Sequence, residues 1–143
     1  MQFKDKVVIV TGGAQGIGRC IADEFGKEGA HVCVIDKKSL SPALPLYGEG
    51  VDYFQGDLSV KETIEEFCRW VIDKHKHVDY IVNNALPLMK GIDECSYEEF
   101  QYAMSVGVTA PFYLAKLLKD CLNPNATDKD INRKTDLLGE HND

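Results

Sequence analysis

The stretch VVIVTGGAQGIGRCIADEFG, residues 7 to 26, joins three local signals in direct succession. It begins with a run of β-branched apolar residues, which is typical of a buried strand. A glycine-rich segment comes next, with Gly12, Gly16 and Gly18 at the junction, and apolar residues then recur at every fourth position, at Ile17, Ile21 and Phe25. That spacing favours an amphipathic helix, and Gly29 supplies a stop. The stretch therefore predicts a strand, a tight turn and a helix.

The rest of the chain repeats this alternation. HVCVID (31–36), VDYFQGD (51–57) and VDYIVNNA (78–85) predict three further strands. Between the last two, Ser59 and Glu62 form a capping-box pattern that opens a helix through residue 76. Its apolar face is predicted to be Val60, Ile64, Phe67, Cys68, Val71 and Ile72. Alternating strands and helices imply a parallel sheet covered on both faces, a Rossmann-type doubly wound α/β fold cut short after about four strands.

A last helical stretch follows the fourth strand. Ser96 and Glu99 predict its start, and the apolar residues Phe100, Ala103 and Met104 continue it. Pro111 cannot donate a backbone hydrogen bond, so we expect a kink or break near 105 to 111 before the helix resumes as FYLAKLLKDCL.

Composition limits the classes of function. The chain has 143 residues, enough for one domain, with 44% hydrophobic and 27% charged residues and a formal net charge of −7. That charge argues against binding nucleic acid or anionic lipid. No apolar run approaches the roughly 18 residues that span a bilayer, and the N-terminus does not resemble a signal peptide. We therefore expect a cytoplasmic protein.

Cysteine and histidine patterns suggest structural roles. The five cysteines are widely spaced and form no CxxC pair, which indicates reduced core residues rather than a disulfide or zinc framework. His75 and His77 could be imagined as metal ligands, but they stand where the predicted helix ends, a place that favours cationic side chains. The NAT triplet at 125–127 matches a glycosylation acceptor, which we attribute to chance.

The first glycine turn carries a chemical implication. A tight turn at the start of a helix exposes backbone N–H groups that can receive a pyrophosphate. Asp36 ends the next predicted strand 18 residues after Gly18, near the spacing of about 20 expected for an acid that binds ribose hydroxyls. The alternative is that the glycines serve only the turn, as glycines often do.

Three motifs together resemble the short-chain dehydrogenase/reductase family: TGGAQGIG at 11–18, GDL at 56–58 and NNA at 83–85. The resemblance covers residues 1 to about 122 and implies a nicotinamide cofactor. It implies that Asp57 contacts the adenine and that the backbone of Leu58 lies beside it. It also implies that the NNA stretch supports the sheet and borders the nicotinamide ribose. For Asn83 and Asn84, the alternative is that they form only a turn at the end of a strand. The expected cofactor-binding residues are Gly12, Gln15, Gly16, Ile17, Gly18, Asp36, Asp57, Leu58, Asn83, Asn84 and Ala85.

The chain departs from the family pattern at three places. Leu86 stands where the family usually has the glycine of NNAG, and Gly107 stands where it usually has a catalytic asparagine. The third departure is the acid/base centre, a serine followed by a Tyr-xxx-Lys pair whose lysine lowers the pKa of the tyrosine. None of the six tyrosines (Tyr47, Tyr53, Tyr80, Tyr97, Tyr102 and Tyr113) has a lysine four residues later.

Two classes of function remain open. The first is an oxidoreductase that acts on an alcohol/carbonyl pair, represented by a cofactor-binding domain (1–122) and a polar divergent tail (123–143). Such a tail would result from a frameshift, an early stop or a truncated gene model. The coding DNA discriminates between the two classes: this class is favoured if a shifted reading frame encodes an apolar strand, a serine and a Tyr-xxx-Lys helix. The second is a natural minimal nucleotide-binding or interaction module without catalysis.

Two further expectations concern the cofactor and assembly. Asp36 favours NAD(H) over NADP(H) because its charge repels a 2′-phosphate and Gln15 is neutral, with Lys37 and Lys38 as the counter-argument. The resemblance implies that a missing fifth strand and partner subunit leave the fourth strand's edge exposed, together with a helix face of Phe112, Leu114, Leu117 and Leu118. Open edges and apolar patches promote self-association.

Overall fold

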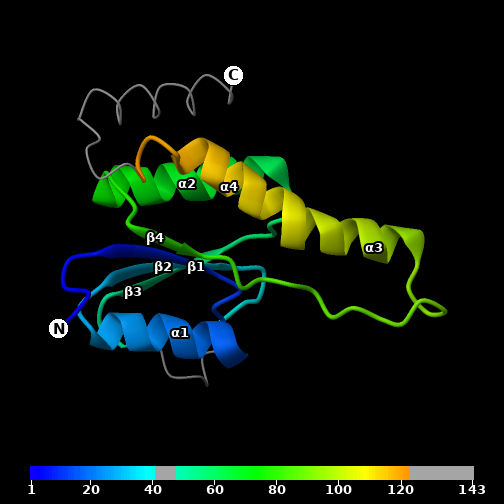
Figure 1. Ribbon diagram of the computed structural model, residues 1–143, viewed down its shortest axis with the longest axis horizontal. Coiled ribbons are helices and arrows are strands. Elements are labelled where there is room, and N and C mark those ends of the chain that lie inside the picture. The colour runs from blue at the N-terminus through cyan, green and yellow to red at the C-terminus, as the bar shows by residue number, and fades with distance from the viewer. Residues whose placement is uncertain (41–47, 123–143) are drawn as a thin grey trace.

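A four-stranded parallel sheet forms the centre of the computed structural model, which describes residues 1–40 and 48–122 (Figure 1). The strands are β1 (Val7–Thr11), β2 (His31–Asp36), β3 (Val51–Gln55) and β4 (Tyr80–Val82), in the order β3-β2-β1-β4. Val8 of β1 pairs with Val32 on one side and with Tyr80 on the other. The predicted α/β fold with a parallel sheet is confirmed, although β4 is shorter than the predicted 78–85.

Helices cover both faces of the sheet (Figure 1). Helix α1 (Gly16–Lys27) lies on one face; α2 (Lys61–His75) and α4 (Ala110–Leu118) lie on the other. Alternate residues of β1 explain this arrangement, since Val8 and Val10 belong to the cluster around α1 while Val7 and Ile9 belong to the cluster around α2 and α4. All four side chains are buried, as expected for a strand covered on both sides.

The start of α2 differs from the prediction. Its N-cap is Val60, which makes no side-chain capping bond, so the capping box at Ser59 and Glu62 is wrong. Ser59 donates its backbone N–H to Asp57 Oδ1 instead, at 2.9 Å, in an Asx-type turn that precedes the helix. The predicted apolar face is buried from Ile64 onward, whereas Val60 is 42% exposed. The helix ends at His75, with Lys76 in the left-handed conformation, which confirms the predicted end.

Ser96 accepts a hydrogen bond from the backbone of Glu99 at 3.0 Å and so caps α3 (Tyr97–Met104), as predicted. The expected break is a π-helical segment, Ser105–Thr109, between α3 and α4. Pro111 lies in the first turn of α4. A wider π turn before a proline accommodates the ring and the missing N–H without ending the helix.

The last helix packs differently from the expectation. Leu114, Leu117 and Leu118 are buried in the cluster between α4 and α2, so the prediction that they form an open face is wrong. Phe112 is 65% exposed, and further apolar side chains are exposed N-terminal to it, at Phe100, Met104 and Val108. β4 lies at the edge of the sheet among the described strands, as predicted. The predicted tail, 123–143, and Tyr47 lie outside the described residues.

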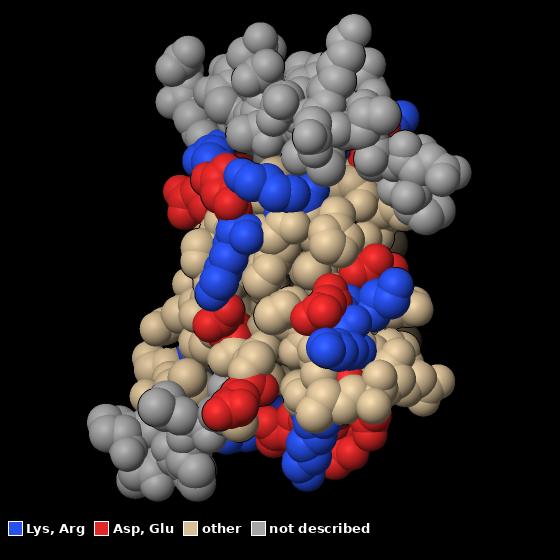
Figure 2. All heavy atoms as spheres, turned by 90° about the vertical axis from the view of Figure 1, so that its left-hand side faces the viewer, with Lys and Arg blue, Asp and Glu red and all other residues tan. Residues whose placement is uncertain are grey.

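All five cysteines are free thiols, and Cys33, Cys68 and Cys121 are buried as predicted, whereas Cys20 is exposed and Cys95 is only partly buried, so neither belongs to the core. On the face that Figure 2 shows, Lys and Arg side chains are interspersed with Asp and Glu, and neither sign forms a broad patch there. Among the described residues, no helix has the length and apolar character needed to cross a membrane.

Candidate nucleotide-binding site

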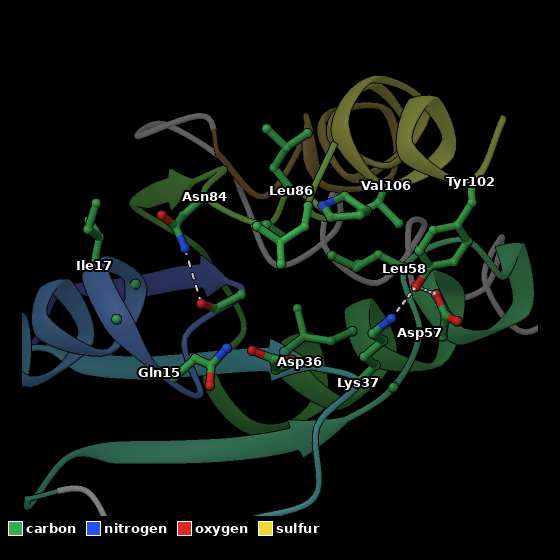
Figure 3. Close-up of a pocket in the computed structure, with 18 residues that line it drawn as sticks. Gln15, Ile17, Asp36, Lys37, Asp57, Leu58, Asn84, Leu86, Tyr102 and Val106 are labelled. Carbon is green, nitrogen blue, oxygen red and sulfur yellow. Dashed lines mark hydrogen bonds between the residues drawn. The ribbon is translucent and has the colours of Figure 1, made fainter. Parts of the chain in front are cut away.

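A pocket of about 850 Å³ lies at the carboxyl ends of the four strands. Segments that follow all four strands line it, a position where open α/β sheets generally bind ligands. Ten of the eleven residues predicted for the site line this pocket: Gly12, Gln15, Gly16, Ile17, Gly18, Asp36, Asp57, Leu58, Asn84 and Ala85 (Figure 3). The exception is Asn83, which is exposed and does not line the pocket.

The glycines of the first turn meet two different requirements. Gly12 and Gly18 allow close packing: a Cβ on Gly12 would lie 2.8 Å from Ala85 Cα, and one on Gly18 would lie 2.3 Å from the Gly12 carbonyl oxygen. Gly16 instead has a φ of +59° and nothing within 4 Å of the place of a Cβ. Its backbone is therefore open to a ligand at the start of α1.

The N-terminus of α1 is free of competing acceptors within the helix's own first turn. Gln15 is the N-cap residue, makes no side-chain capping bond, and no acidic residue follows in the first turn. The N–H groups and positive dipole end of the helix thus remain available to an anion. Ile17 is 75% exposed beside them, so the buried face of α1 is set by Gly18 and Ala22 rather than by the predicted Ile17.

Asn84 ties the NNA segment to the glycine turn. Its backbone N–H and that of Ala85 both donate to Thr11 Oγ1 at 3.0 Å, and its side-chain Nδ2 donates to the Gly12 carbonyl at 3.1 Å. These bonds fix the ends of β1 and β4 beside one another. Thr11 is buried, and its positioning role was not predicted, although it begins the glycine motif.

Asp36 is oriented by backbone donors. Its Oδ2 accepts from Ala14 N at 3.0 Å and its Oδ1 from Lys38 N at 3.1 Å. A carboxylate has about four acceptor positions, so these bonds fix the side chain and leave acceptor capacity toward the pocket. The spacing argument for Asp36 therefore leads to a carboxylate beside the glycine turn, where Figure 3 shows it close to Gln15.

Asp57 carries a stabilised negative charge at the end of β3. Partial burial opposes its ionisation, but hydrogen bonds from the backbone and hydroxyl of Ser59 and from Tyr102 outweigh burial and hold its pKa below the usual value. Asp57 Oδ1 accepts the bond from Tyr102 at 3.2 Å. Asp57 is thus a fixed, charged acceptor on the opposite side of the pocket from the glycine turn.

Several lining residues were not predicted as site residues: Ile35, Lys37, Gly56, Leu86, Pro87, Leu88, Tyr102 and Val106. Leu86 was identified only as a departure from the family pattern and Lys37 only as a counter-argument to NAD. Tyr102 and Val106 are four residues apart on consecutive helical segments. This spacing places both side chains on the same face of a helix, and it was the one sequence signal for their shared position.

Among the residues that the structure describes, no cluster of three or more candidate metal ligands occurs around the histidines or elsewhere. His77 Nε2 lies 3.0 Å from Asp79 Oδ2, and this carboxylate also accepts from Val7 N at 2.7 Å. These contacts join the end of α2 to the start of β1, at the opposite end of this strand from the pocket.

Comparison with known families decides the affiliation. The family model described as short chain dehydrogenase matches residues 6–129. This chain belongs to the short-chain dehydrogenase family. An uncharacterized oxidoreductase of Thermotoga maritima is 36% identical in an alignment of 129 positions that covers 81% of this chain and 48% of the relative. The chain spans about half the length of the curated relatives it matches.

Solved structures agree on the fold. An apo SCOR enzyme from Clostridium thermocellum is 35% identical, with a TM-score of 0.70 over 82% of this chain and 49% of that one. A metagenomic short-chain oxidoreductase solved in complex with NADP has a TM-score of 0.73 at 24% identity, over 85% of this chain and 58% of that one. The family resemblance and the Rossmann-type fold are therefore confirmed, while the choice between NAD and NADP rests on the residues of this chain.

Proposed function

We propose that this polypeptide binds NAD(H) at the carboxyl ends of its strands and represents the cofactor-binding half of an oxidoreductase acting on an alcohol/carbonyl pair. One arrangement carries the proposal: the open backbone of Gly16 at the uncapped start of α1, with the fixed carboxylate of Asp36 beside it. The helix start would receive the pyrophosphate and Asp36 the ribose hydroxyls. Asp57, across the pocket, would accept a hydrogen bond from the adenine.

The preference for NAD(H) over NADP(H) rests on charge. A 2′-phosphate would lie near the Asp36 carboxylate, and like charges at short range repel. The two lysines that follow Asp36 already have partners, since Lys38 Nζ donates to Gln15 Oε1 and Lys37 Nζ donates to Tyr102. A solved structure of the same fold holds NADP, so the fold alone does not exclude this cofactor and the preference is argued from the side chains.

We further propose that the 143 residues do not catalyse hydride transfer by themselves. They contain no Tyr-xxx-Lys pair, and general acid–base assistance typically contributes about 10²–10⁴-fold. Tyr113 and Lys116 are only three apart. Burial and a hydrogen bond to Glu65 raise the pKa of Tyr113 to about 12, the opposite of what a proton-transferring tyrosine needs.

Calorimetry and absorbance spectroscopy together test this function. NAD titrated into the chain should bind weakly, while NADH absorbance should not change with a panel of ketones and alcohols. Robust turnover would disprove the proposed lack of catalysis. Absence of binding at millimolar NAD would disprove the cofactor site.

The alternative, a non-catalytic nucleotide-binding or interaction module, is favoured by one observation. Phe100, Met104, Val108 and Phe112 expose 50%, 42%, 54% and 65% of their surface along the segment from α3 to α4. Exposed apolar side chains in such number promote association. We propose that the chain self-associates through this segment, and not through Leu114, Leu117 and Leu118, which are buried.

A further inference from the structure

One tyrosine joins three elements at the far side of the pocket. The Tyr102 hydroxyl, on α3, donates to Asp57 Oδ1 at 3.2 Å and accepts from Lys37 Nζ at 3.2 Å. The Lys37 amine also lies over the Tyr102 ring, 4.9 Å from its centroid, within range of a cation–π contact. Figure 3 shows the Lys37 side chain extending toward Tyr102 and Asp57 and away from Gln15.

Lys37 is the one lysine or arginine among the described residues that line the pocket. It directly follows Asp36, so its amine is within a side chain's length of the region proposed for the adenosine ribose. The hydrogen bond from Lys37 to Tyr102 raises the pKa of the amine, which therefore stays charged at neutral pH. A charged amine near a ribose phosphate would offset the repulsion from Asp36.

We propose that Tyr102 sets the selectivity of this pocket for NAD over NADP by holding the Lys37 amine away from the ribose. The hydroxyl and the ring both contribute: the hydroxyl accepts from the amine, the ring attracts it, and Asp57 anchors the hydroxyl from the other side. Tyr102 is thus a positioning residue that acts through Lys37. This inference rests on the proposed function, since it requires a nucleotide in the pocket.

The test compares dissociation constants for NADPH and NADH in wild type, Tyr102→Phe, Tyr102→Leu and Lys37→Gln chains and in the two double variants with Lys37→Gln. Tyr102→Phe removes the hydroxyl and keeps the ring, whereas Tyr102→Leu removes both. We expect the ratio of Kd for NADPH to Kd for NADH to fall by roughly two- to fivefold in Tyr102→Phe, the effect of one exposed ion pair, and further in Tyr102→Leu. Added salt should reduce the effect.

The Lys37→Gln background distinguishes a change in cofactor selectivity that acts through Lys37 from a general loss of nucleotide binding or folding. There, neither change at Tyr102 should alter the ratio, because no amine remains to be released. An unchanged ratio in both single variants, or an equal change without Lys37, overturns the inference while leaving the cofactor site intact. If the wild type binds neither nucleotide at millimolar concentration, the proposed function fails and this inference fails with it.

Discussion

Leu86 occupies the space that a side chain at Gly107 would need: a Cβ built on Gly107 lies 2.9 Å from Leu86 Cδ1. These are the two positions at which the chain departs from the short-chain dehydrogenase pattern outside the Tyr-xxx-Lys centre. They belong to one contact between the loop after β4 and the π-helical segment, so the two departures compensate for one another sterically. The family's asparagine would not fit at 107 unless Leu86 moved.

A double-mutant cycle measures this contact. Gly107→Ala should favour the helix by about 0.5–1 kcal/mol but force Leu86 from its rotamer at a cost of about 0.5–1.5 kcal/mol. In a Leu86→Ala background that cost disappears. We expect Gly107→Ala to be more stabilising there, by about 0.5–1.5 kcal/mol in urea unfolding. Additive effects would show that the two positions are independent.

The close packing at Gly18 gives a second prediction. A Cβ at this position would lie 2.3 Å from the Gly12 carbonyl and 2.4 Å from Asn84 Nδ2, both of which are held in the turn. Gly18→Ala should therefore cost about 1–3 kcal/mol of stability and abolish nucleotide binding. Gly91→Ala is the matched control, because nothing lies within 4 Å of its Cβ. Thermal unfolding and NADH fluorescence of both variants check this, and normal binding by Gly18→Ala would contradict the packing account.

The local signals of the sequence predicted the fold and most of the pocket. The run 7–26 encodes strand, turn and helix without help from distant residues, so Gly12, Gly16 and Gly18 were placed correctly. Errors arose where two local interactions compete or where distant elements meet. Ser59 could cap α2 or bond to Asp57, and the second interaction prevailed because the carboxylate accepts both its N–H and its hydroxyl.

Long-range contacts account for the other errors. Leu114, Leu117 and Leu118 were predicted to be open because the family resemblance implied a missing partner subunit, but they pack against α2 within the chain. The apolar spacing of α4 alone does not reveal this contact. The hydrogen bond between Lys37 and Tyr102 joins residues 65 positions apart, and no sequence pattern links them.

Tyr113 gives a pH-dependent prediction. Its hydroxyl donates to the buried Glu65 at 3.0 Å, and burial followed by this bond raises its pKa from 10.0 to about 12. The unfolded chain therefore loses the phenol proton at lower pH than the folded one. The contribution to stability is complete below pH 10, and it is lost as the pH rises from 10 toward 12.

Tyr113→Phe should lower the free energy of unfolding by about 1–2 kcal/mol at pH 8, since Glu65 loses its hydroxyl partner. The difference from wild type should shrink between pH 10 and 12. Tyr97→Phe, on an exposed tyrosine, is the control and should change stability by less than about 0.5 kcal/mol. A difference that is constant with pH would mean that Tyr113 titrates normally.

Self-association should depend on the exposed apolar segment. Phe112→Glu and Val108→Glu place charges where side chains are 65% and 54% exposed, so they should favour the monomer without unfolding it. Val60→Glu, at the start of α2, is the control and should leave the association unchanged. Sedimentation velocity over a range of concentrations checks this. A wild-type chain that stays monomeric throughout would disprove the proposed association.

Dissecting the cofactor by calorimetry tests the central claim, that this chain holds the adenosine and pyrophosphate part of NAD. The contacts proposed for Gly16, Asp36 and Asp57 are all made to that part, whereas the Tyr-xxx-Lys pair of the family pattern is absent from the 143 residues. ADP-ribose should therefore bind within about threefold of NAD, a difference of about 0.7 kcal/mol, and nicotinamide mononucleotide should give no binding heat. Failure of both NAD and ADP-ribose to bind at millimolar concentration, or binding of nicotinamide mononucleotide as tight as that of NAD, would contradict the account.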